Sequence, residues 1–446
     1  MKKALVLKFP FLTILFLGLL LRTIIMLLYN YPSFCPDSAG YIELAKKITT
    51  GTLLGYNGLR TPGYPLLILL MGSNYKLVVG LQILMDALSC YFIYDIIKKY
   101  NPLVALLSSL YFFTLVNVIM FSLAILTESA TQFFLIFLIW LVERFQVYKL
   151  APSYLINALA AFLLMVLFFV RPMFIYVTPI LAFFMLFYLK RGNITKGYGK
   201  ILLILTLPFL TYFGWNYLNY INNGWFTPTT FLGINLAQNS VSFFQYVPDE
   251  HQEIREIYIK YREKAKKTDG NEAAAIWRAH DELIEKTQLS EVELSRKLAE
   301  ICKPLIKSHP KEYGIQVVKN WSLFWNAYPY YYDELIIYSN LFKIVHLVWW
   351  AQKFILWLLY AFFLPLSVLA FIRSVKDWNI FTFENLLLAI IYAASILQAL
   401  VTYGENSRFS FPLFPLVLIF LSIELTKFER VKKWIDWILK SSQSFL

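Results

Sequence analysis

Six ionisable residues stand at or beside the ends of long apolar stretches, where carboxylates and guanidinium groups can take part in chemistry. They are Asp37, Arg60, Glu128, Arg171, Glu405 and Arg408. A carboxylate accepts a proton from a hydroxyl or holds that hydroxyl in place. A guanidinium group is a permanently charged fork of donors that suits phosphate. Together these groups suit a reaction that activates a hydroxyl and expels a phosphate.

Charged residues in such positions also have a purely structural explanation. A charged side chain at the centre of a bilayer costs about 3 kcal/mol, so charges collect in the turns between membrane helices. For Glu128 or Arg171 taken alone, both explanations stand. A connection between membrane helices needs only polar residues, however. The requirement for polar residues does not explain why carboxylates and arginines occur together in several of these turns.

The apolar stretches themselves predict a polytopic helical membrane protein. The chain has 446 residues, of which 59% are hydrophobic and 15% charged, whereas a soluble domain is roughly a quarter charged. This composition excludes a soluble enzyme, a fibrous protein and a disordered chain, and the uninterrupted runs exclude a transmembrane barrel, in which apolar residues alternate. We predict an all-α fold with about ten transmembrane helices, in a range of about nine to thirteen. The predicted helices span 9–29, 77–97, 103–125, 128–146, 154–170, 173–189, 201–219, 354–372, 384–402 and 409–426.

The basic residues predict the orientation in the membrane. With the N-terminus in the cytoplasm, every predicted inner loop carries Lys or Arg, while the short outer turns carry only Arg171 and Arg408, as the positive-inside rule requires. We therefore expect a multi-pass protein of the cytoplasmic membrane, with both termini in the cytoplasm and all six ionisable residues outside it. These loops explain the net charge of +13, so we predict no nucleic-acid partner.

Four regions follow from this orientation. They are an N-terminal transmembrane module (1–220) that contains a long first outer loop (31–76), an extracytoplasmic helical domain (221–353), C-terminal transmembrane helices (354–426) and a cytoplasmic amphipathic tail (427–446). In the outer domain, Ser290 and Glu293 form a capping box that predicts a helix start. Within the membrane, Arg22 and Asp86 lie at similar depth in consecutive helices, which predicts a structural ion pair.

The sequence predicts no metal or nucleotide cofactor. The three cysteines are isolated from one another, and the four histidines lack the spacing of zinc ligands. No glycine-rich phosphate loop is present. A divalent metal therefore has no support in these residues.

Five ordered motifs carry a resemblance to a known family. They are Asp37-Ser38-x-x-Tyr41, Arg60-x-Pro62-Gly63-Tyr64-Pro65, Thr127-Glu128-Ser129, Arg171-Pro172 and Glu405-x-x-Arg408-x-x-x-Pro412. In this order the chain resembles the GT-C glycosyltransferases, and more narrowly the dolichyl-phosphate-mannose–protein mannosyltransferases and lipid A aminoarabinose transferases. The resemblance covers about 20–425 and lies in the motifs rather than in the sequence between them.

The resemblance implies a GT-C-like arrangement of helices and a membrane enzyme that transfers a hexosyl or pentosyl group with inversion. The donor would be a polyprenyl-phosphate-linked sugar, and the acceptor a hydroxyl of a glycan, lipid or protein outside the cytoplasm. The first outer acidic position of the family is matched by Asp37, as the base or the group that orients the acceptor, and the second by Glu128. Arg60, Arg171 and Arg408 become candidates for binding the donor phosphate.

Tyr41, Tyr64 and Glu405 are the further residues that we expect to bind substrate. Aromatic rings can stack on sugar rings, although most aromatic residues of the outer segments are better explained as an interfacial belt. One departure from the family pattern concerns the metal. Ser38 follows Asp37 where the paired-acid version of the motif has a second acid, which weakens the case for a bound divalent ion.

Three other functions remain open at this stage. A transporter or flippase of lipid-linked sugars needs polar residues at mid-membrane or broken helices in corresponding halves, and only Arg22 and Asp86 are obvious there. A lipid-linked glycan polymerase or ligase also expels a lipid-linked phosphate, and the sequence does not separate it from a sugar transferase. A non-enzymatic membrane assembly protein leaves the six ionisable residues unexplained.

Overall fold

The protein is helical throughout the part of the chain that the structure describes. The computed structural model describes residues 10–192, 197–328, 330–404 and 406–429. Within these ranges there are helices, turns and loops but no β-strand, which confirms the predicted all-α fold. Glu405 and nearly all of the predicted C-terminal tail fall outside the described residues.

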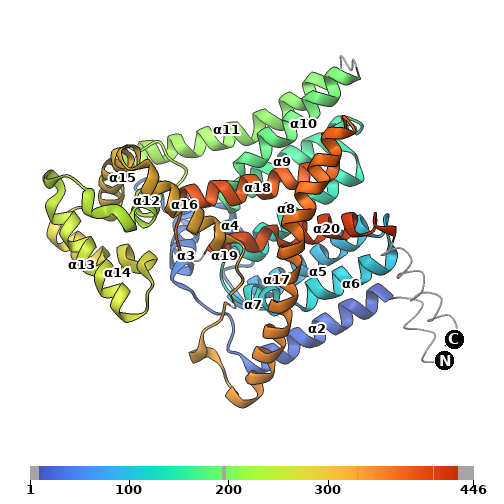
Figure 1. Ribbon diagram of the computed structural model, residues 1–446. Helices are drawn as coiled ribbons and strands as arrows, with labels where there is room; N and C mark the ends of the chain where they lie inside the picture. The colour runs from blue at the N-terminus through green and yellow to red at the C-terminus, as the bar shows by residue number, and fades with distance from the viewer. Residues whose placement is uncertain (1–9, 193–196, 329, 405, 430–446) are drawn as a thin grey trace.

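The apolar helices pack into one bundle (Figure 1) around a single large core of aliphatic and aromatic side chains. Several of them are apolar on nearly every face, as expected of helices surrounded by lipid and by one another. The bundle helices are α2 (Pro10–Leu28), α5 (Tyr75–Ile97), α6 (Pro102–Thr114), α7 (Val116–Leu123), α8 (Glu128–Arg144), α9 (Tyr154–Val170), α10 (Val177–Arg191), α11 (Tyr198–Asn223), α17 (Ser339–Lys376), α18 (Phe383–Val401) and α20 (Phe414–Leu425).

Length and composition allow many of these helices to cross a membrane. In the described part of the chain, seven helical stretches are long and apolar enough, or eight if α6 and α7, which meet at a bend of 45°, form one crossing. Helices α8 and α9 have 17 residues each and are shorter than those seven. The structure thus supports a polytopic helical membrane protein, while the count of ten crossings stays a prediction.

The bend between α6 and α7 has an identifiable cause. Leu115, between the two helices, has extended backbone angles (φ −64°, ψ 122°), which interrupts the helical hydrogen bonds. The side chain of Gln352 on α17 replaces them: its Oε1 accepts from Val116 N at 2.8 Å and its Nε2 donates to Thr114 O at 2.8 Å. Backbone groups inside a membrane must be satisfied within the protein, so Gln352 makes the break tolerable.

Shorter helices fill the two segments that were predicted to lie outside the membrane. The first outer loop contains α3 (Pro36–Thr49) and α4 (Gly63–Leu70). The outer domain has its own apolar core, as a separate folding unit requires. Its helices are α12 (Leu232–Asn239), α13 (Gln252–Thr268), α14 (Ala275–Thr287), α15 (Glu291–Ser308) and α16 (Pro310–Phe324), with 3₁₀ turns η4 (Val241–Tyr246), η5 (Asp249–His251) and η6 (Glu272–Ala274).

The remaining short elements connect the bundle helices. They are η1 (Val147–Lys149), η2 (Pro172–Tyr176), η7 (Asp333–Leu335), α19 (Asn406–Ser410) and η8 (Phe411–Leu413). The predicted membrane helix at 354–372 lies within α17, which is one helix of 38 residues and begins at Ser339. The sequence had also allowed a further helix in the segment before 354.

The capping box at the start of α15 is present as predicted. Glu293 N donates to Ser290 Oγ at 3.3 Å, and Ser290 N donates to Glu293 Oε2 at 2.9 Å. These two bonds satisfy backbone donors that a helix start otherwise leaves free. The apolar face that follows packs into the core of the outer domain, where Leu294 and Leu298 are fully buried.

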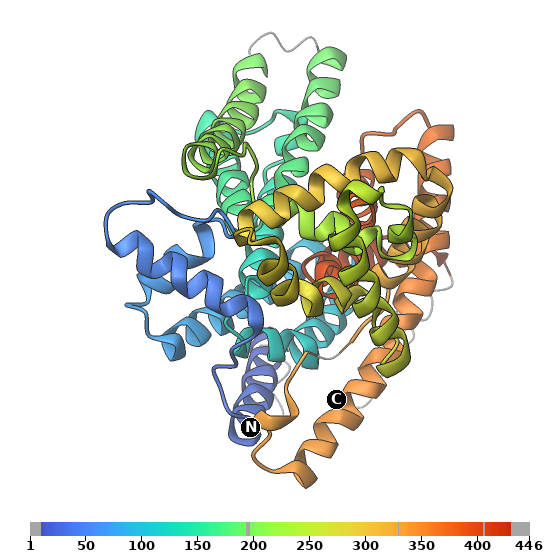
Figure 2. The same cartoon turned by 90° about the vertical axis from the view of Figure 1, so that its left-hand side faces the viewer.

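The outer domain is docked on the C-terminal end of α18. Asn239 Nδ2 donates to Ala399 O at 3.1 Å and to Leu400 O at 2.8 Å, and the Tyr313 hydroxyl donates to Leu400 O at 2.6 Å. These are carbonyls of the last helical turn, which lack partners within the helix. Figure 2 shows the outer helices lying across this end of the bundle, with the first-loop helices beside them.

The predicted pair between Arg22 and Asp86 is confirmed. Arg22 Nη2 lies 3.1 Å from Asp86 Oδ2, and both side chains are 1% exposed. Arg22 Nη1 also donates to Phe113 O at 2.6 Å, so one guanidinium group connects α2, α5 and α6. Buried charges of this kind need partners, because an unpaired charge in a low-dielectric interior is destabilising.

Removing one member of this pair should cost more stability than removing both. Arg22→Met or Asp86→Leu alone leaves a buried unpaired charge and should destabilise the protein by about 3–5 kcal/mol, whereas the double variant should recover much of that loss. Folded yield and unfolding temperature in detergent measure the effect, with Thr23→Val on the exposed face of α2 as control. A double variant less stable than either single variant would contradict a pairing role.

Candidate functional site

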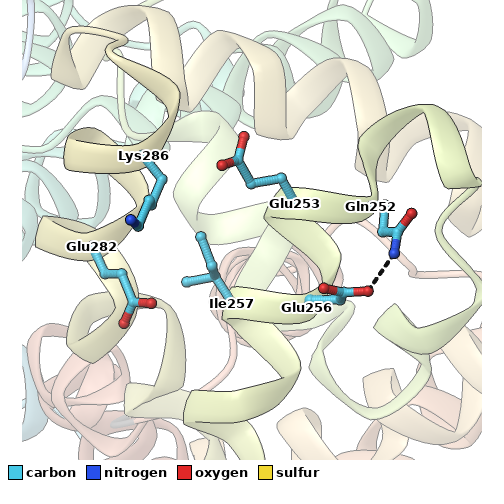
Figure 3. Close-up of a pocket in the computed structure, with 6 residues that line it drawn as sticks. All are labelled: Gln252, Glu253, Glu256, Ile257, Glu282 and Lys286. Carbon is cyan, nitrogen blue, oxygen red and sulfur yellow. Dashed lines mark hydrogen bonds between the residues drawn. The ribbon is translucent and has the colours of Figure 1, made fainter.

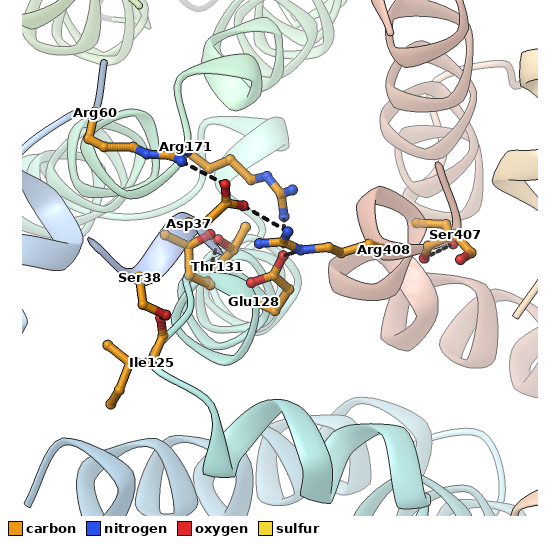
Figure 4. Close-up of polar contacts among 11 residues, drawn as sticks. Asp37, Ser38, Arg60, Ile125, Glu128, Thr131, Arg171, Ser407 and Arg408 are labelled. Carbon is orange, nitrogen blue, oxygen red and sulfur yellow. Dashed lines mark hydrogen bonds and ion pairs between the residues drawn. The ribbon is translucent and has the colours of Figure 1, made fainter. Parts of the chain in front are cut away.

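Five of the six predicted ionisable residues meet at one end of the helix bundle (Figure 4). Asp37 lies in the first turn of α3, Glu128 is the first residue of α8, and Arg171 follows the last residue of α9. Arg60 precedes α4, and Arg408 lies in α19. The sixth residue, Glu405, lies outside the described residues. The tertiary structure thus joins positions that are up to several hundred residues apart in sequence.

Ion pairs connect these five side chains into one network. Asp37 Oδ1 lies 2.6 Å from Arg60 Nη2, and Asp37 Oδ2 lies 2.7 Å from Arg408 Nη1. Arg408 Nε also donates to Glu128 Oε1, so Arg408 bridges both carboxylates. Arg171 Nη1 is 3.7 Å from the same Glu128 oxygen. Three guanidinium groups against two carboxylates leave an excess of one positive charge, which favours binding of an anion.

Local sequence places Asp37 at the start of a helix. Pro36 occupies the first turn, where its fixed φ angle and missing N–H are tolerated. Ser38 Oγ accepts from Cys35 N at 2.9 Å and donates to Ile125 O at 2.8 Å. Ser38 therefore ties the start of α3 to the segment that leads into α8.

This role explains the departure at Ser38 from the paired-acid pattern. The Ser38 side chain is buried, with 1% of the residue exposed, and both of its hydrogen bonds go to backbone groups. A carboxylate at this position could still accept from Cys35 N, but it could not donate to Ile125 O and would face that carbonyl with like partial charge. The residue after Asp37 thus serves in positioning.

Arg60 and Arg171 are also held by their local surroundings. The Tyr56 hydroxyl accepts from Arg60 N at 2.6 Å and donates to Arg60 O at 2.9 Å, which closes the turn. Arg171 has an extended backbone (φ −150°, ψ 102°), because the residue before a proline, here Pro172, is disfavoured in the helical region. Helix α9 therefore ends where its arginine meets Glu128.

A cavity of about 610 Å³ opens beside the network. Its lining includes Asp37, Arg60, Arg171 and Arg408. The Asp37 side chain is 33% exposed, whereas that of Glu128 is 0% exposed and is not part of the lining. The two predicted acidic residues thus differ in access: Asp37 faces the cavity, and Glu128 lies behind the arginines that it contacts.

The two predicted tyrosines also differ. Tyr41 lines the cavity, and the Arg60 guanidinium group lies over its ring at 4.7 Å. Tyr64 is 1% exposed, donates to Gln82 Oε1 at 2.8 Å and meets Tyr41 edge to face at 5.2 Å. The expectation that Tyr64 contacts substrate has no support in this geometry, since Tyr64 packs behind Tyr41 and stabilises its position.

The charge state of Asp37 follows from its partners. Partial burial would raise the pKa of Asp37, but the neighbouring Arg60 and Arg408 outweigh burial and lower the pKa to about 2. Asp37 is therefore ionised throughout the physiological range. A carboxylate with so low a pKa accepts a proton poorly, and its first capability is to orient a hydroxyl through a charge-assisted hydrogen bond.

Several residues of the cavity wall were not identified from the sequence. The Arg60 guanidinium group lies 4.8 Å from the centre of the Phe231 ring, in addition to its contact with Tyr41. Amide and hydroxyl side chains come from the outer domain and from the end of α18, among them Asn235, Asn271 and Gln398. No motif marks these positions, because their access to the cavity depends on how the outer domain docks on the bundle.

A separate hollow of about 390 Å³ lies on the outer domain at α13 and α14 (Figure 3). Two of its three acidic residues are bonded within the protein: Glu282 pairs with Lys260 at 2.7 Å, and Glu256 accepts from Gln252 at 2.5 Å. In the described ranges, no group of three or more His, Cys, Asp and Glu side chains is placed to hold a metal ion. This hollow is a solvated surface between two helices.

Comparisons with known proteins do not identify a family. No protein-family model matches the chain, and no curated protein is significantly similar to it. The chemistry of the site therefore follows from its own geometry, together with the motifs quoted above.

Asp37 should make stability depend on acid pH. Its pKa of about 2 in the folded protein lies below the value of about 3.9 expected in the unfolded chain. The folded state thus binds fewer protons than the unfolded chain in this range. The contribution of Asp37 to the free energy of unfolding is therefore complete above about pH 4 and is lost as the pH falls through about 2. Asp37→Asn should lower the unfolding temperature at pH 7. Between about pH 4 and pH 2, the unfolding temperature of this variant should also fall less steeply than that of the unmodified protein.

The matched control for this experiment is Asp333→Asn, which alters an exposed carboxylate. This control should unfold like the unmodified protein at every pH. An Asp37→Asn variant with unchanged stability and an unchanged pH profile would show that the ion pairs of Asp37 contribute nothing to the folded state.

Proposed function

We propose that this protein is a membrane glycosyltransferase of GT-C type. It would move a sugar from a polyprenyl-phosphate-linked donor to an acceptor hydroxyl, with inversion. The observation that carries this proposal is the position of Asp37: an accessible, ionised carboxylate held between Arg60 and Arg408 on the wall of a cavity. The order of the motifs supports the same function by resemblance.

The reaction needs two kinds of group at one place. The acceptor oxygen attacks the anomeric carbon from one side, and the bond from that carbon to the phosphate oxygen breaks on the other side, which inverts the configuration. The electron pair of the broken bond goes to the phosphate, whose negative charge increases. Guanidinium groups already held in position stabilise such a developing charge. The hydroxyl proton passes to Asp37, or to water while Asp37 holds the hydroxyl.

The ion pairs of the site give a reason for coupling donor binding to activation of the acceptor. Both oxygens of Asp37 are bonded to guanidinium groups. A donor phosphate competes with Asp37 for Arg60 and Arg408, so it frees one carboxylate oxygen for the acceptor hydroxyl. Weaker contact with the arginines also raises the pKa of Asp37 towards its ordinary value, which makes it a better proton acceptor.

Glu128 receives a positioning role in this proposal. It is fully buried, bridges Arg408 and Arg171 through one oxygen, and does not line the cavity. Its negative charge compensates two guanidinium groups that would otherwise repel each other. Arg60, Arg171 and Arg408 are the proposed phosphate ligands, and Tyr41 borders the substrate.

One observation disfavours the alternative of a transporter or flippase. The two charges expected at mid-membrane, Arg22 and Asp86, are bonded to each other and are buried, so they offer no open binding site along a path. A lipid-linked glycan polymerase or ligase shares the proposed chemistry and differs only in the size of the acceptor.

Orientation forms part of the proposal. Basic residues lie at the helix ends opposite the site, such as Arg144 at the end of α8, which begins with Glu128. By the positive-inside rule, these ends face the cytoplasm and the site faces outward. The protein would then be a multi-pass component of the cytoplasmic membrane, with its termini in the cytoplasm.

Thiol labelling in intact spheroplasts tests this orientation. The three native cysteines are free and buried, so the background should be low. Asp281→Cys in the outer domain should react with an impermeant maleimide, whereas Asp377→Cys, after the end of α17, should react only after permeabilisation. Both side chains are exposed, which makes the pair comparable. The reverse pattern, or equal labelling at both positions, would contradict the proposed topology.

Sugar transfer itself is tested with purified protein in nanodiscs, a polyprenyl-phosphate-linked sugar and a hydroxyl acceptor. Release of free polyprenyl phosphate should require both substrates. Asp37→Asn should reduce the turnover number by roughly 10²–10⁴-fold, while Asp333→Asn should leave it unchanged. Near-normal turnover by Asp37→Asn would remove Asp37 from the mechanism. Movement of intact donor across the bilayer without release of polyprenyl phosphate would favour a flippase instead.

A further inference from the structure

The two sides of the cavity differ in chemistry. Among the described residues that line it, the charged ones are Asp37, Arg60, Arg171 and Arg408, all of them in the ion-pair network. The wall formed by α12, η6, α14 and the end of α18 offers amides, hydroxyls and aromatic rings. We call this second side the amide wall, and its members used below are Asn235, Asn271, Trp277 and Gln398.

Gln398 is the most informative member of the amide wall. The residue is 6% exposed and lines the cavity, yet its Nε2 has no hydrogen-bond partner in the described part of the chain. Buried amide nitrogens are nearly always bonded. Other polar groups at this end of α18 are bonded to the outer domain, as Asn239 and Tyr313 show. The nitrogen is itself buried, so it reaches an acceptor on a bound molecule when the terminal amide of Gln398 turns towards the cavity.

Trp277 offers an apolar surface in the same cavity. Its side chain is 44% exposed and lines the cavity. It meets Phe231 edge to face at 5.7 Å, and Phe231 in turn lies 4.8 Å from the Arg60 guanidinium group. The row Arg60, Phe231, Trp277 therefore runs from the charged network to the amide wall. A ring attached to a phosphate at Arg60 can thus extend along this row in the direction of Trp277.

We infer that the amide wall is the subsite for an uncharged sugar ring of the donor, with Gln398 selecting its hydroxyl pattern. This inference rests on the proposed function and specifies its substrate class. Amides and hydroxyls bond to sugar hydroxyls, and an aromatic face packs against the apolar face of the ring. An amino sugar or a sugar acid would bring a charge to which the described residues of this wall offer no partner of opposite sign.

Donor binding provides a test that does not depend on turnover. Polyprenyl phosphate linked to a neutral hexose or pentose should raise the unfolding temperature of the protein more than polyprenyl phosphate alone does. The same lipid linked to an amino sugar or a sugar acid should raise the unfolding temperature no more than polyprenyl phosphate alone does. Equal stabilisation by neutral and charged sugars would overturn the inference.

Two substitutions at Gln398 separate a role in specificity from a role in folding. Gln398→Leu should lower kcat/KM for the neutral donor by roughly 10–100-fold. The second substrate is a deoxy donor, in which the sugar lacks the hydroxyl that Gln398 is proposed to bind. Gln398→Leu should lower kcat/KM for this donor only slightly. The ratio of kcat/KM for the parent donor to that for the deoxy donor should therefore fall towards one. Gln398→Glu should shift the preference towards an amino-sugar donor, because it adds a carboxylate beside the ring. Gln252→Leu, in the hollow on α13, is the control and should change neither ratio nor preference.

The outcomes distinguish the inference from the function on which it rests. If the unmodified protein binds neutral donors selectively but transfers none, the proposed function fails and the subsite remains. If it transfers sugar while Gln398→Leu lowers kcat/KM equally for parent and deoxy donors, and Gln398→Glu does not alter preference, the inference is overturned.

Discussion

The structure depends on the compensation of charge around Arg408. This guanidinium group bridges Asp37 and Glu128, and the two carboxylates in turn hold Arg60 and Arg171. Buried charges are tolerated only when they are paired, so the ends of α3, α8, α9 and α19 have to meet. The same pairing leaves one excess positive charge and one accessible carboxylate at the wall of a cavity. Stability and proposed chemistry thus have a common physical origin.

Backbone contacts hold this network in register. Ser33 N donates to Leu123 O at 2.9 Å, and Ile125 N donates to Ser33 O at 3.0 Å, which joins the first outer loop to the segment before α8. Asp37 and Glu128 stand a few residues beyond these bonds. The outer domain completes the cavity from the other side by docking on the last carbonyls of α18. One cavity is therefore lined both by the charged network and by uncharged residues of the outer domain and of α18.

Much of this organisation was predictable because it depends on short stretches of sequence. Apolar runs predicted the helices, and the spacing of Ser290 and Glu293 predicted the start of α15. Similar depth in consecutive helices was sufficient to predict the pair of Arg22 and Asp86. The six ionisable residues stood out because charge is rare in such a sequence. The number of membrane crossings was harder to predict. In hydropathy, a helix of 17 residues or a helix broken at Leu115 does not differ clearly from a helix that crosses the whole membrane.

By itself, the sequence determined the helical class, the apolar character of the bundle and the set of charges available for chemistry. Only the tertiary structure decided which side chains have access to the cavity: Asp37 reaches it, while Glu128 and Tyr64 are buried behind their neighbours. It also assigned Ser38 a structural role and brought Gln398 and Trp277 to the same cavity. The physical reason is that the depth of a side chain depends on packing between segments far apart in the chain, and no local pattern of residues records that packing.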